Sequence, residues 1–455
     1  MDQASSPPEP AETEAEPETG DKTGSISTGR MALLFTVMLV TAAGNTAMQS
    51  VMPSIGTALQ LQDFWISLAY SWSALLWVVC APIWARRSDR RGRKAMMALG
   101  LTGFVVSMVL CGLALWAGLA GVLGAVPALI AFAAARSLYG GFGSAAPPAV
   151  QAYVASRTAP SERTQALSLV ASSFGLGTVF GPVLAPLMVL PFFGIGLTGP
   201  FICYALLGLA ALIVLRLRLP DDEPRFPARG SAYGAPYGDG PHQEGAAGAD
   251  HAADESEKRL RWTDGRVRAW VIAMLIGGHA QAMLLGIVGF LTLDRLGLRD
   301  APAQGASMVS LVLVFGAIAT LLAQWGLIPR FNIGPRAATV WGMAVAGAGS
   351  LILGASEDLF TLALGYAIAS LGFGLFRPGT TAGTSLAVSR AEQGQASGLV
   401  ASAAGASFIY APPLGVWLYN QSDWLGVGLV VALCFAVTAI GWRGLQADSA
   451  LTSDG

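Results

Sequence analysis

Twelve long apolar stretches constrain what this chain can fold into. Each is close to the about 20 residues that an α-helix needs to cross the hydrocarbon core of a bilayer. They are residues 31–52, 64–84, 95–117, 124–146, 165–190, 198–217, 268–291, 304–328, 337–355, 359–379, 396–419 and 425–443. Charged residues make up only 12% of the chain, whereas soluble domains carry about 25%. A water-soluble surface cannot be built from so few charges, so the sequence predicts an all-α membrane protein with twelve transmembrane helices.

The Lys and Arg residues predict how these helices are oriented. An even number of spans places both termini on one side of the membrane. With the termini inside, the cytoplasmic segments hold nearly all of the 27 Lys and Arg residues, and the outer connections hold only Arg295 and Arg299. Cytoplasmic loops collect positive charge in membrane proteins. We therefore expect a multi-pass protein of the cell inner (plasma) membrane with both termini in the cytoplasm.

Polar segments divide the chain into two halves. Residues 1–29 are acidic and Pro-rich, unlike a secretory signal peptide, and predict a disordered cytoplasmic tail. Residues 220–265 are rich in Gly, Ala, Pro, Asp and Glu, and predict a disordered cytoplasmic linker. This leaves an N-terminal six-helix half at 30–219, a C-terminal six-helix half at 266–445 and a C-terminal tail at 446–455.

An internal repeat relates the two halves. Residues 161–175 and 391–405 are identical at eight of 15 positions, at an offset of 230 residues. The same offset pairs Pro182 with Pro412. Each matching segment enters the fifth span of its half from the inside, so the two six-helix repeats are predicted to be parallel.

A basic segment between the second and third spans resembles the signature loop of the major facilitator superfamily. It reads Ala-Arg-Arg-Ser-Asp-Arg-Arg-Gly-Arg-Lys and begins at Ala85, where the family usually has Gly. The match places Asp89, Arg90, Gly92 and Arg93 at the motif's positions. Six cations would also serve simply as a topology signal.

Two further motifs resemble those of the same family. In the fourth span Arg136 is followed four residues later by Gly140, with Tyr139 where the family usually has Gln. In the fifth span Gly177, Gly181 and Pro182 match a signature of drug–proton antiporters, although its closing Gly pair is replaced by Ala-Pro.

The resemblance covers nearly all of the chain except the tails and the linker. Among subfamilies the chain looks most like the twelve-span exporters that include tetracycline pumps, multidrug pumps and bacterial metallophore exporters. It implies a secondary active transporter that works by alternating access of the two halves. It also implies that Asp89 contacts the N-terminus of the eleventh span in the outward-facing state. Arg90 and Arg93 would then pair with nearby carboxylates, Glu162 or Glu392.

Small residues recur every four positions in the fifth span. Gly177 and Gly181 form a smooth stripe that lets another helix approach closely, and Pro182 bends the helix beyond it. Tight packing alone would explain the pattern. The resemblance adds that the bend separates exporters from importers by controlling leakage, and the sequence leaves both interpretations open.

The deep polar groups predict a substrate cavity between the halves. Ionisable side chains inside a membrane are costly and indicate function. Three basic ones, Arg136, His279 and Arg377, lie deep in spans, whereas no carboxylate does. The predicted lining consists of these three residues with Asn45, Gln49, Tyr139 and Gln281. Structural alternatives remain for each basic group: a hydrogen-bond hub for Arg136, a neutral bonded imidazole for His279, and a side chain reaching the inner interface for Arg377.

These residues predict a proton-coupled exporter of a small anionic or zwitterionic organic compound, such as a drug, metabolite or metallophore. Four candidates remain for the group that carries the proton: His279, Asp63, Asp294 and the substrate itself. The alternatives are an importer of small organic anions and a membrane sensor with the same fold that transports nothing. The sequence shows no nucleophile–base pair, metal-ligand spacing or phosphate loop. It therefore predicts that the protein is not an enzyme and binds no metal or cofactor. The expected partners are the substrate, protons and the lipid bilayer, with no nucleic acid, and the chain is expected to be a monomer.

Overall fold

A computed structural model of the chain describes residues 26–158, 160–190, 194–220, 260–389 and 392–448. The side chains of Asp89, Arg90 and Glu162 lie outside this description, as do most of the predicted N-terminal tail and most of the predicted linker.

The N-terminal half consists of seven α-helices that make six spans. They are α1 (Thr28–Ala58), α2 (Asp63–Arg91), α3 (Arg93–Leu119), α4 (Ala125–Phe142), α5 (Ala146–Ala155), α6 (Pro160–Leu184) and α7 (Gly199–Arg218). A 3-10 turn, η1 (Gly143–Ala145), joins α4 to α5, so that Ala125–Ala155 forms one span. A second 3-10 turn, η2 (Pro186–Met188), follows α6.

The C-terminal half repeats this plan. Its helices are α8 (Arg268–Arg295), α9 (Pro302–Leu321), α10 (Ile328–Phe331), α11 (Pro335–Gly354), α12 (Leu359–Leu386), α13 (Gln393–Gln421) and α14 (Asp423–Gly444). A π-helical turn, η3 (Leu322–Leu327), continues α9 into α10, so that Pro302–Phe331 forms one span.

The all-helical fold with twelve spans agrees with the sequence prediction. Eleven of the described helical segments are long and apolar enough to cross a membrane, and α6 adds a shorter apolar run over Ser172–Leu184. Several spans are longer than predicted, among them the fourth and the tenth. The fourth continues to Ala155 instead of residue 146, and the tenth continues to Leu386 instead of residue 379. Pro147 and Pro148 follow the predicted end of the fourth span, but they lie in the first turn of α5, where proline is tolerated. The extension of the tenth span contains Thr380, Thr381, Thr384 and Ser385, which a count of apolar residues misses.

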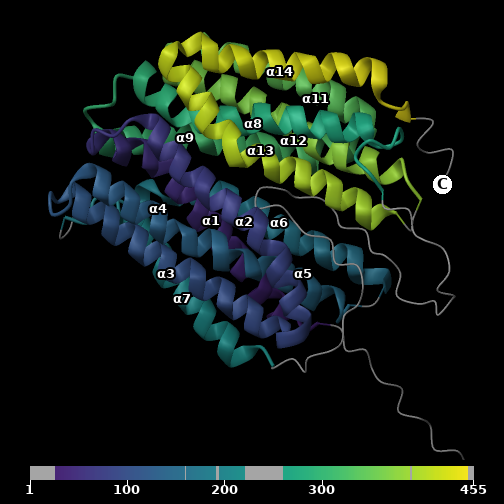
Figure 1. Cartoon of the computed structure of the whole chain (residues 1–455), viewed down its shortest axis with the longest axis horizontal. Coiled ribbons are helices and arrows are strands. Elements are labelled where there is room, and N and C mark those ends of the chain that lie inside the picture. The colour runs from purple at the N-terminus through teal and green to yellow at the C-terminus, as the bar shows by residue number, and fades with distance from the viewer. Residues whose placement is uncertain (1–25, 159, 191–193, 221–259, 390–391, 449–455) are drawn as a thin grey trace, which may run out of the picture.

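The two halves lie side by side in Figure 1, the N-terminal half in purple to teal and the C-terminal half in green to yellow. The repeat-related helices α7 and α14 lie on opposite edges of the bundle. We call the end of the bundle at which α8 begins and α14 ends the inner end, and the opposite end the outer end.

The repeat also appears in the helix packing. In the N-terminal half α6 packs against α1, where a Cβ on Gly177 would lie 2.6 Å from the Ala42 Cβ. In the C-terminal half α13 packs against α8, where a Cβ on Gly415 would lie 3.0 Å from the Met283 Cβ. The fifth helix of each half thus approaches the first helix of the same half.

The described ends of the linker and of the C-terminal tail correct their predicted disorder. Leu260, inside the predicted linker 220–265, is buried, and its backbone N–H donates to Gln395 Oε1 at 2.7 Å. Asp448, in the predicted tail 446–455, accepts from the backbone N–H groups of Arg336 at 2.7 Å and Ala337 at 3.2 Å. These N–H groups belong to the first turn of α11 and have no partner within the helix, so the Asp448 carboxylate caps them.

Candidate binding cavities between the two halves

A cavity of about 180 Å³ lies between the halves, toward their inner ends. Its N-terminal wall comes from α1 and α6, and its C-terminal wall from α8, α9, η3, α12 and α13. Of the predicted site residues, Gln49, Gln281, Arg377 and Pro182 line it. We call it the lower cavity.

The lower cavity combines one positive charge with several amides and aromatic rings. Among the described lining residues, Arg377 is the only charged one and none is Asp or Glu. Gln49, Gln281 and Gln324 supply hydrogen-bond donors and acceptors. Apolar surface comes from four aromatic residues, Phe174, Tyr366, Phe373 and Phe408. A molecule with an anionic group and an aromatic or aliphatic body would find a partner here for each of its parts.

Two of these lining residues were missed by the sequence prediction, and each left a signal. Gln324 is an amide in an otherwise apolar span. Tyr366 lies 230 residues after Arg136, at the position that the internal repeat makes equivalent.

A second, smaller cavity of about 80 Å³ lies nearer the outer end. Its lining is mainly apolar, with hydroxyl groups from Ser67, Tyr70 and Ser71 of α2. Four residues line both cavities and so lie between them: Gln49, Leu285, Leu313 and Phe408. We call this one the upper cavity.

Arg136 lies inside the N-terminal half and lines neither cavity. It is buried in α4 and 2% exposed, and Nη2 donates to Asn45 Oδ1 of α1. Its guanidinium lies over the ring of Tyr139, 4.7 Å from the centroid, and over that of Tyr70, 5.1 Å from the centroid. Tyr70 also lines the upper cavity, so one aromatic ring contacts both the guanidinium and that cavity. The predicted residues Asn45, Arg136 and Tyr139 therefore form one cluster, with the ring of Tyr70 between them and the upper cavity.

The Arg136 guanidinium is incompletely hydrogen-bonded. Within the described part of the chain, Nε and Nη1 are buried and have no hydrogen-bond partner. The two aromatic faces offset part of the missing polar contact through cation–π attraction. The fold thus holds an incompletely paired guanidinium in its interior, at a cost in stability.

His279 lies on a different face of α8 from Gln281. Residues two apart on a helix point about 200° apart. Gln281 lines the lower cavity, whereas the His279 imidazole contacts Tyr410 Oη and Ser407 Oγ of α13, the latter at 3.1 Å. Tyr410 is 53% exposed. His279 thus lines neither cavity, contrary to the expectation from the sequence.

The glycine stripe of α6 brings two helix backbones together. A Cβ on Gly181 would lie 2.0 Å from Thr46 Oγ1 and 2.4 Å from the Ala43 carbonyl oxygen. Thr46 Oγ1 in turn donates to the Gly177 carbonyl at 3.2 Å. This is the close helix approach that the sequence predicted, and it positions Pro182 in the wall of the lower cavity.

The basic segment at the inner end is mostly helical, not a loop. Gly92, at φ 88°, is the single residue between α2 and α3, and its left-handed backbone makes the turn. Arg93 begins α3 and donates to Ser156 Oγ, next to the end of α5. The contacts predicted for Asp89 and Arg90 depend on side chains outside the described part of the chain.

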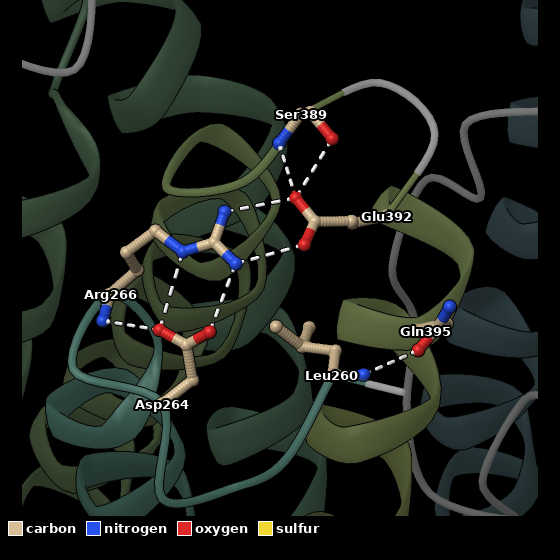
Figure 2. A network of polar contacts seen from close by, with 6 residues as sticks. All are labelled: Leu260, Asp264, Arg266, Ser389, Glu392 and Gln395. Carbon is tan, nitrogen blue, oxygen red and sulfur yellow. Dashed lines mark hydrogen bonds and ion pairs between the residues drawn. The ribbon is translucent and has the colours of Figure 1, made fainter. Parts of the chain in front are cut away.

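Glu392 has a different partner from the predicted Arg90 or Arg93. Arg266, between the linker and α8, donates to both of its oxygens at 2.9 and 2.8 Å, and also pairs with Asp264 at 2.9 Å (Figure 2). Hydrogen bonds from Arg266 and then Ser389 lower the pKa of Glu392 to about 2. The end of the linker thus folds back onto the start of α13.

The chain matches a known protein family. The family model described as "Major Facilitator Superfamily" matches residues 34–332 and 330–451. The chain is similar to the class C tetracycline resistance protein of Escherichia coli, with 24% identity over 79% of this chain and 81% of that protein. It is also 30% identical to a probable actinorhodin transporter of Streptomyces coelicolor, over 41% of this chain but only 31% of that longer protein.

Solved structures show the same fold. A bacterial homologue of the human lysosomal transporter Spinster, in an inward-facing and unoccupied conformation, superposes with a TM-score of 0.67 at 12% identity. The superposition covers 92% of this chain and 98% of that one.

Proposed function

The chain belongs to the Major Facilitator Superfamily, and we propose that it exports a small anionic or zwitterionic organic compound across the inner membrane in exchange for protons. It is a multi-pass secondary transporter of a small molecule and not an enzyme. Its two halves would expose the cavity between them to each side of the membrane in turn.

The observation that carries the proposal is the charge of the lower cavity. Arg377 supplies a guanidinium, and the described lining residues include no carboxylate. In a site largely shielded from water such a charge favours an anionic partner, which it can bind through two parallel hydrogen bonds. The Arg136 cluster adds a second positive charge behind the wall of the upper cavity. A cation would meet two positive groups and no negative one among the described lining residues.

Export is supported by the relatives and by the fifth span. Two similar proteins are described as a tetracycline resistance protein and a probable actinorhodin transporter. The antiporter-like motif Gly177–Pro182 packs tightly on α1 beside the lower cavity. Import of an organic anion would use the same cavity, so direction is an outcome of the experiment below.

The test is charge selectivity at Arg377. Purified protein in liposomes would be given three fluorescent compounds of one scaffold, bearing a carboxylate, a neutral ester or a tertiary amine. We expect Arg377→Gln to lower flux of the carboxylate by about tenfold or more while leaving the neutral ester within about twofold. Arg377→Lys should retain part of the carboxylate flux.

Arg330→Gln serves as the matched control, because Arg330 is an exposed arginine at the inner end of α10 that lines neither cavity. Equal loss for all three compounds in Arg377→Gln, or faster flux of the amine than of the carboxylate in the wild type, would overturn the anionic substrate. Sidedness of the flux in oriented liposomes decides between export and import.

A further inference from the structure

An ion pair joins the two halves at their outer ends. Asp63 is the first residue of α2 in the N-terminal half. Arg299 lies between α8 and α9 in the C-terminal half. Its Nη1 and Nη2 donate to the two carboxylate oxygens of Asp63, both at 2.8 Å. This is the bidentate geometry in which arginine holds a carboxylate most strongly.

Arg299 is shared with a second carboxylate from its own half. Its Nε donates to Asp294 Oδ1 at 2.6 Å, and Nη2 donates to Asp294 Oδ2 at 2.9 Å. Tyr419 Oη of α13 also donates to Asp294 Oδ2, at 2.6 Å. One guanidinium therefore holds two carboxylates, and only Asp294 has a phenol as a further donor.

The turn after α8 fixes Arg299 to the C-terminal half. Gly297 has φ 64°, and the backbone N–H of Leu298 donates to the Leu293 carbonyl at 2.9 Å. This is the glycine-terminated helix end in which the chain reverses direction. The reversal returns Arg299 to Asp294, five residues earlier, so the contact between these two does not depend on the N-terminal half.

Asp63 is the member of the group that lies away from water. Its side chain is 7% exposed, against 31% for Arg299 and 35% for Asp294. In the described part of the chain Asp63 is the one buried carboxylate. Burial disfavours the charged form of a carboxylate unless a cation remains beside it.

The three side chains of this group together carry one negative charge, which one bound proton would neutralise. Asp63 and Asp294 with Arg299 sum to one negative charge. Arg295 points its Nη2 at Asp423 of α14, 3.1 Å away, and at the Gly354 carbonyl. From α1 the group meets only the hydroxyl of Thr57, 3.4 Å from Arg299 Nη1, and the neighbouring Asp300 is exposed.

We propose that Asp63, Arg299 and Asp294 form the outer gate of the transporter, and that a proton bound by Asp63 from the outer side opens it. Protonation removes the charge that Arg299 holds across the interface, while Arg299 keeps its charge and its bonds to Asp294. The outer ends can then separate, with Arg299 staying on the C-terminal half. Loss of the proton restores the bidentate pair and closes the outer end. This inference rests on the proposed alternating movement of the halves, but not on the identity of the substrate.

The test is the distance between the outer ends as a function of pH. Spin labels would be placed at Val122, in the outer loop after α3, and at Phe360, in the first turn of α12. These side chains are 70% and 84% exposed. The four native cysteines would be replaced first. Double electron–electron resonance on purified protein without substrate would then follow the distance from pH 8 to pH 4.5.

We expect the longer-distance population to grow as the pH falls. Asp63→Asn, which mimics the protonated carboxylate, should raise the open-to-closed ratio at pH 8 by about tenfold and abolish the pH response. Asp294→Asn should keep a pH response, because the Asp63–Arg299 pair remains. Asp423→Asn, which breaks an ion pair at the same outer surface within one half, should behave as the wild type.

Two results would overturn the gate. One is a wild-type distance that does not change with pH, a measurement that needs no substitution at the gate. The other is an Asp63→Asn variant with the wild-type pH response. Failure of the proposed function would look different, as a gate that opens with pH in a protein that moves no organic anion in liposomes.

Discussion

Arg136 shows at the scale of a single residue how this fold keeps charge in its interior. One side-chain hydrogen bond, to Asn45, and two aromatic faces hold its guanidinium, and two of its nitrogens lack a hydrogen-bond partner within the described residues. A residue retained only for stability would be better paired. We therefore propose that Arg136 acts as a charge, through Tyr70, on the upper cavity.

The expected behaviour of Arg136→Met follows from that assignment. Transport of an organic anion should fall by about tenfold or more. The melting temperature should stay level or rise, because replacing an incompletely paired buried charge with an apolar side chain is often neutral or stabilising. Flux assays and thermal unfolding in detergent would measure both quantities. Ser137→Ala, one residue further along α4, is the control. Wild-type transport in Arg136→Met would reduce Arg136 to a packing role.

Glu392 predicts a pH dependence at the inner surface. Arg266 lowers its pKa from 4.5 to about 2 in the folded chain. A depressed pKa gives a stabilising contribution that is present above pH 4.5 and lost as the pH falls toward 2. Hydrogen exchange of residues 260–266, corrected for intrinsic rates, should therefore accelerate over that interval. Because the Arg266 side chain is 45% exposed, salt should weaken the contact as well.

Glu392→Gln should show the accelerated exchange at neutral pH, whereas Asp300→Asn at the outer end should not. Exchange in residues 260–266 that is the same in Glu392→Gln and wild type would mean that the Leu260–Gln395 bond alone holds the segment.

At the scale of the helices, the packing of α6 on α1 leaves no room for an added side chain. An added methyl group at Gly181 has backbone and Thr46 within 2.4 Å, so the helices must move apart. Gly181→Ala should lower stability by about 1–3 kcal/mol, as over-packing does. Gly428→Ala in α14, where a Cβ meets nothing within 4 Å, should be neutral or slightly stabilising. Thermal unfolding of both variants makes the comparison, and equal melting temperatures would contradict the close contact.

The inner end of α2 carries a further prediction. Asp89 is the lone carboxylate among six cations, so Asp89→Asn should leave membrane insertion intact while reducing transport severely. Arg87→Gln, which changes the charge of the same helix end, should transport normally. Flux and membrane yield would be measured for both. Normal flux in Asp89→Asn would leave the segment as a topology signal alone.

The sequence predicts where the helices lie along the chain better than it predicts which side of each helix faces a cavity. Twenty apolar residues mark a span whatever it packs against, so all twelve were found. The face that each helix turns inward depends on its neighbours. His279 illustrates this, since it points to α13 while Gln281, two residues later, lines the lower cavity. Helical ends rich in Thr and Ser, such as residues 380–386 of α12, carry little apolar signal.

At the scale of the whole molecule, contacts between the halves were the least predictable. Arg295 and Arg299 were recognised as the outer cations, and Asp63 and Asp294 as outer carboxylates. Nothing in their spacing showed that Arg299 would reach across to Asp63 while Arg295 would stay with Asp423. Likewise, Gln49, Gln281 and Arg377 were each expected in a cavity, but Gln324 and Tyr366 joined them only through the packing of α9 and α12.

Coupled flux tests the central proposal most directly. Purified protein would be reconstituted in liposomes with an imposed pH gradient, and the movement of a fluorescent organic carboxylate would be followed with and without a protonophore. We expect the anion to accumulate against its own gradient on the side from which protons leave, and the accumulation to collapse when the protonophore is added. Movement no faster than in protein-free liposomes, across a panel of anions and with folded protein confirmed, would contradict proton-coupled anion export by this chain.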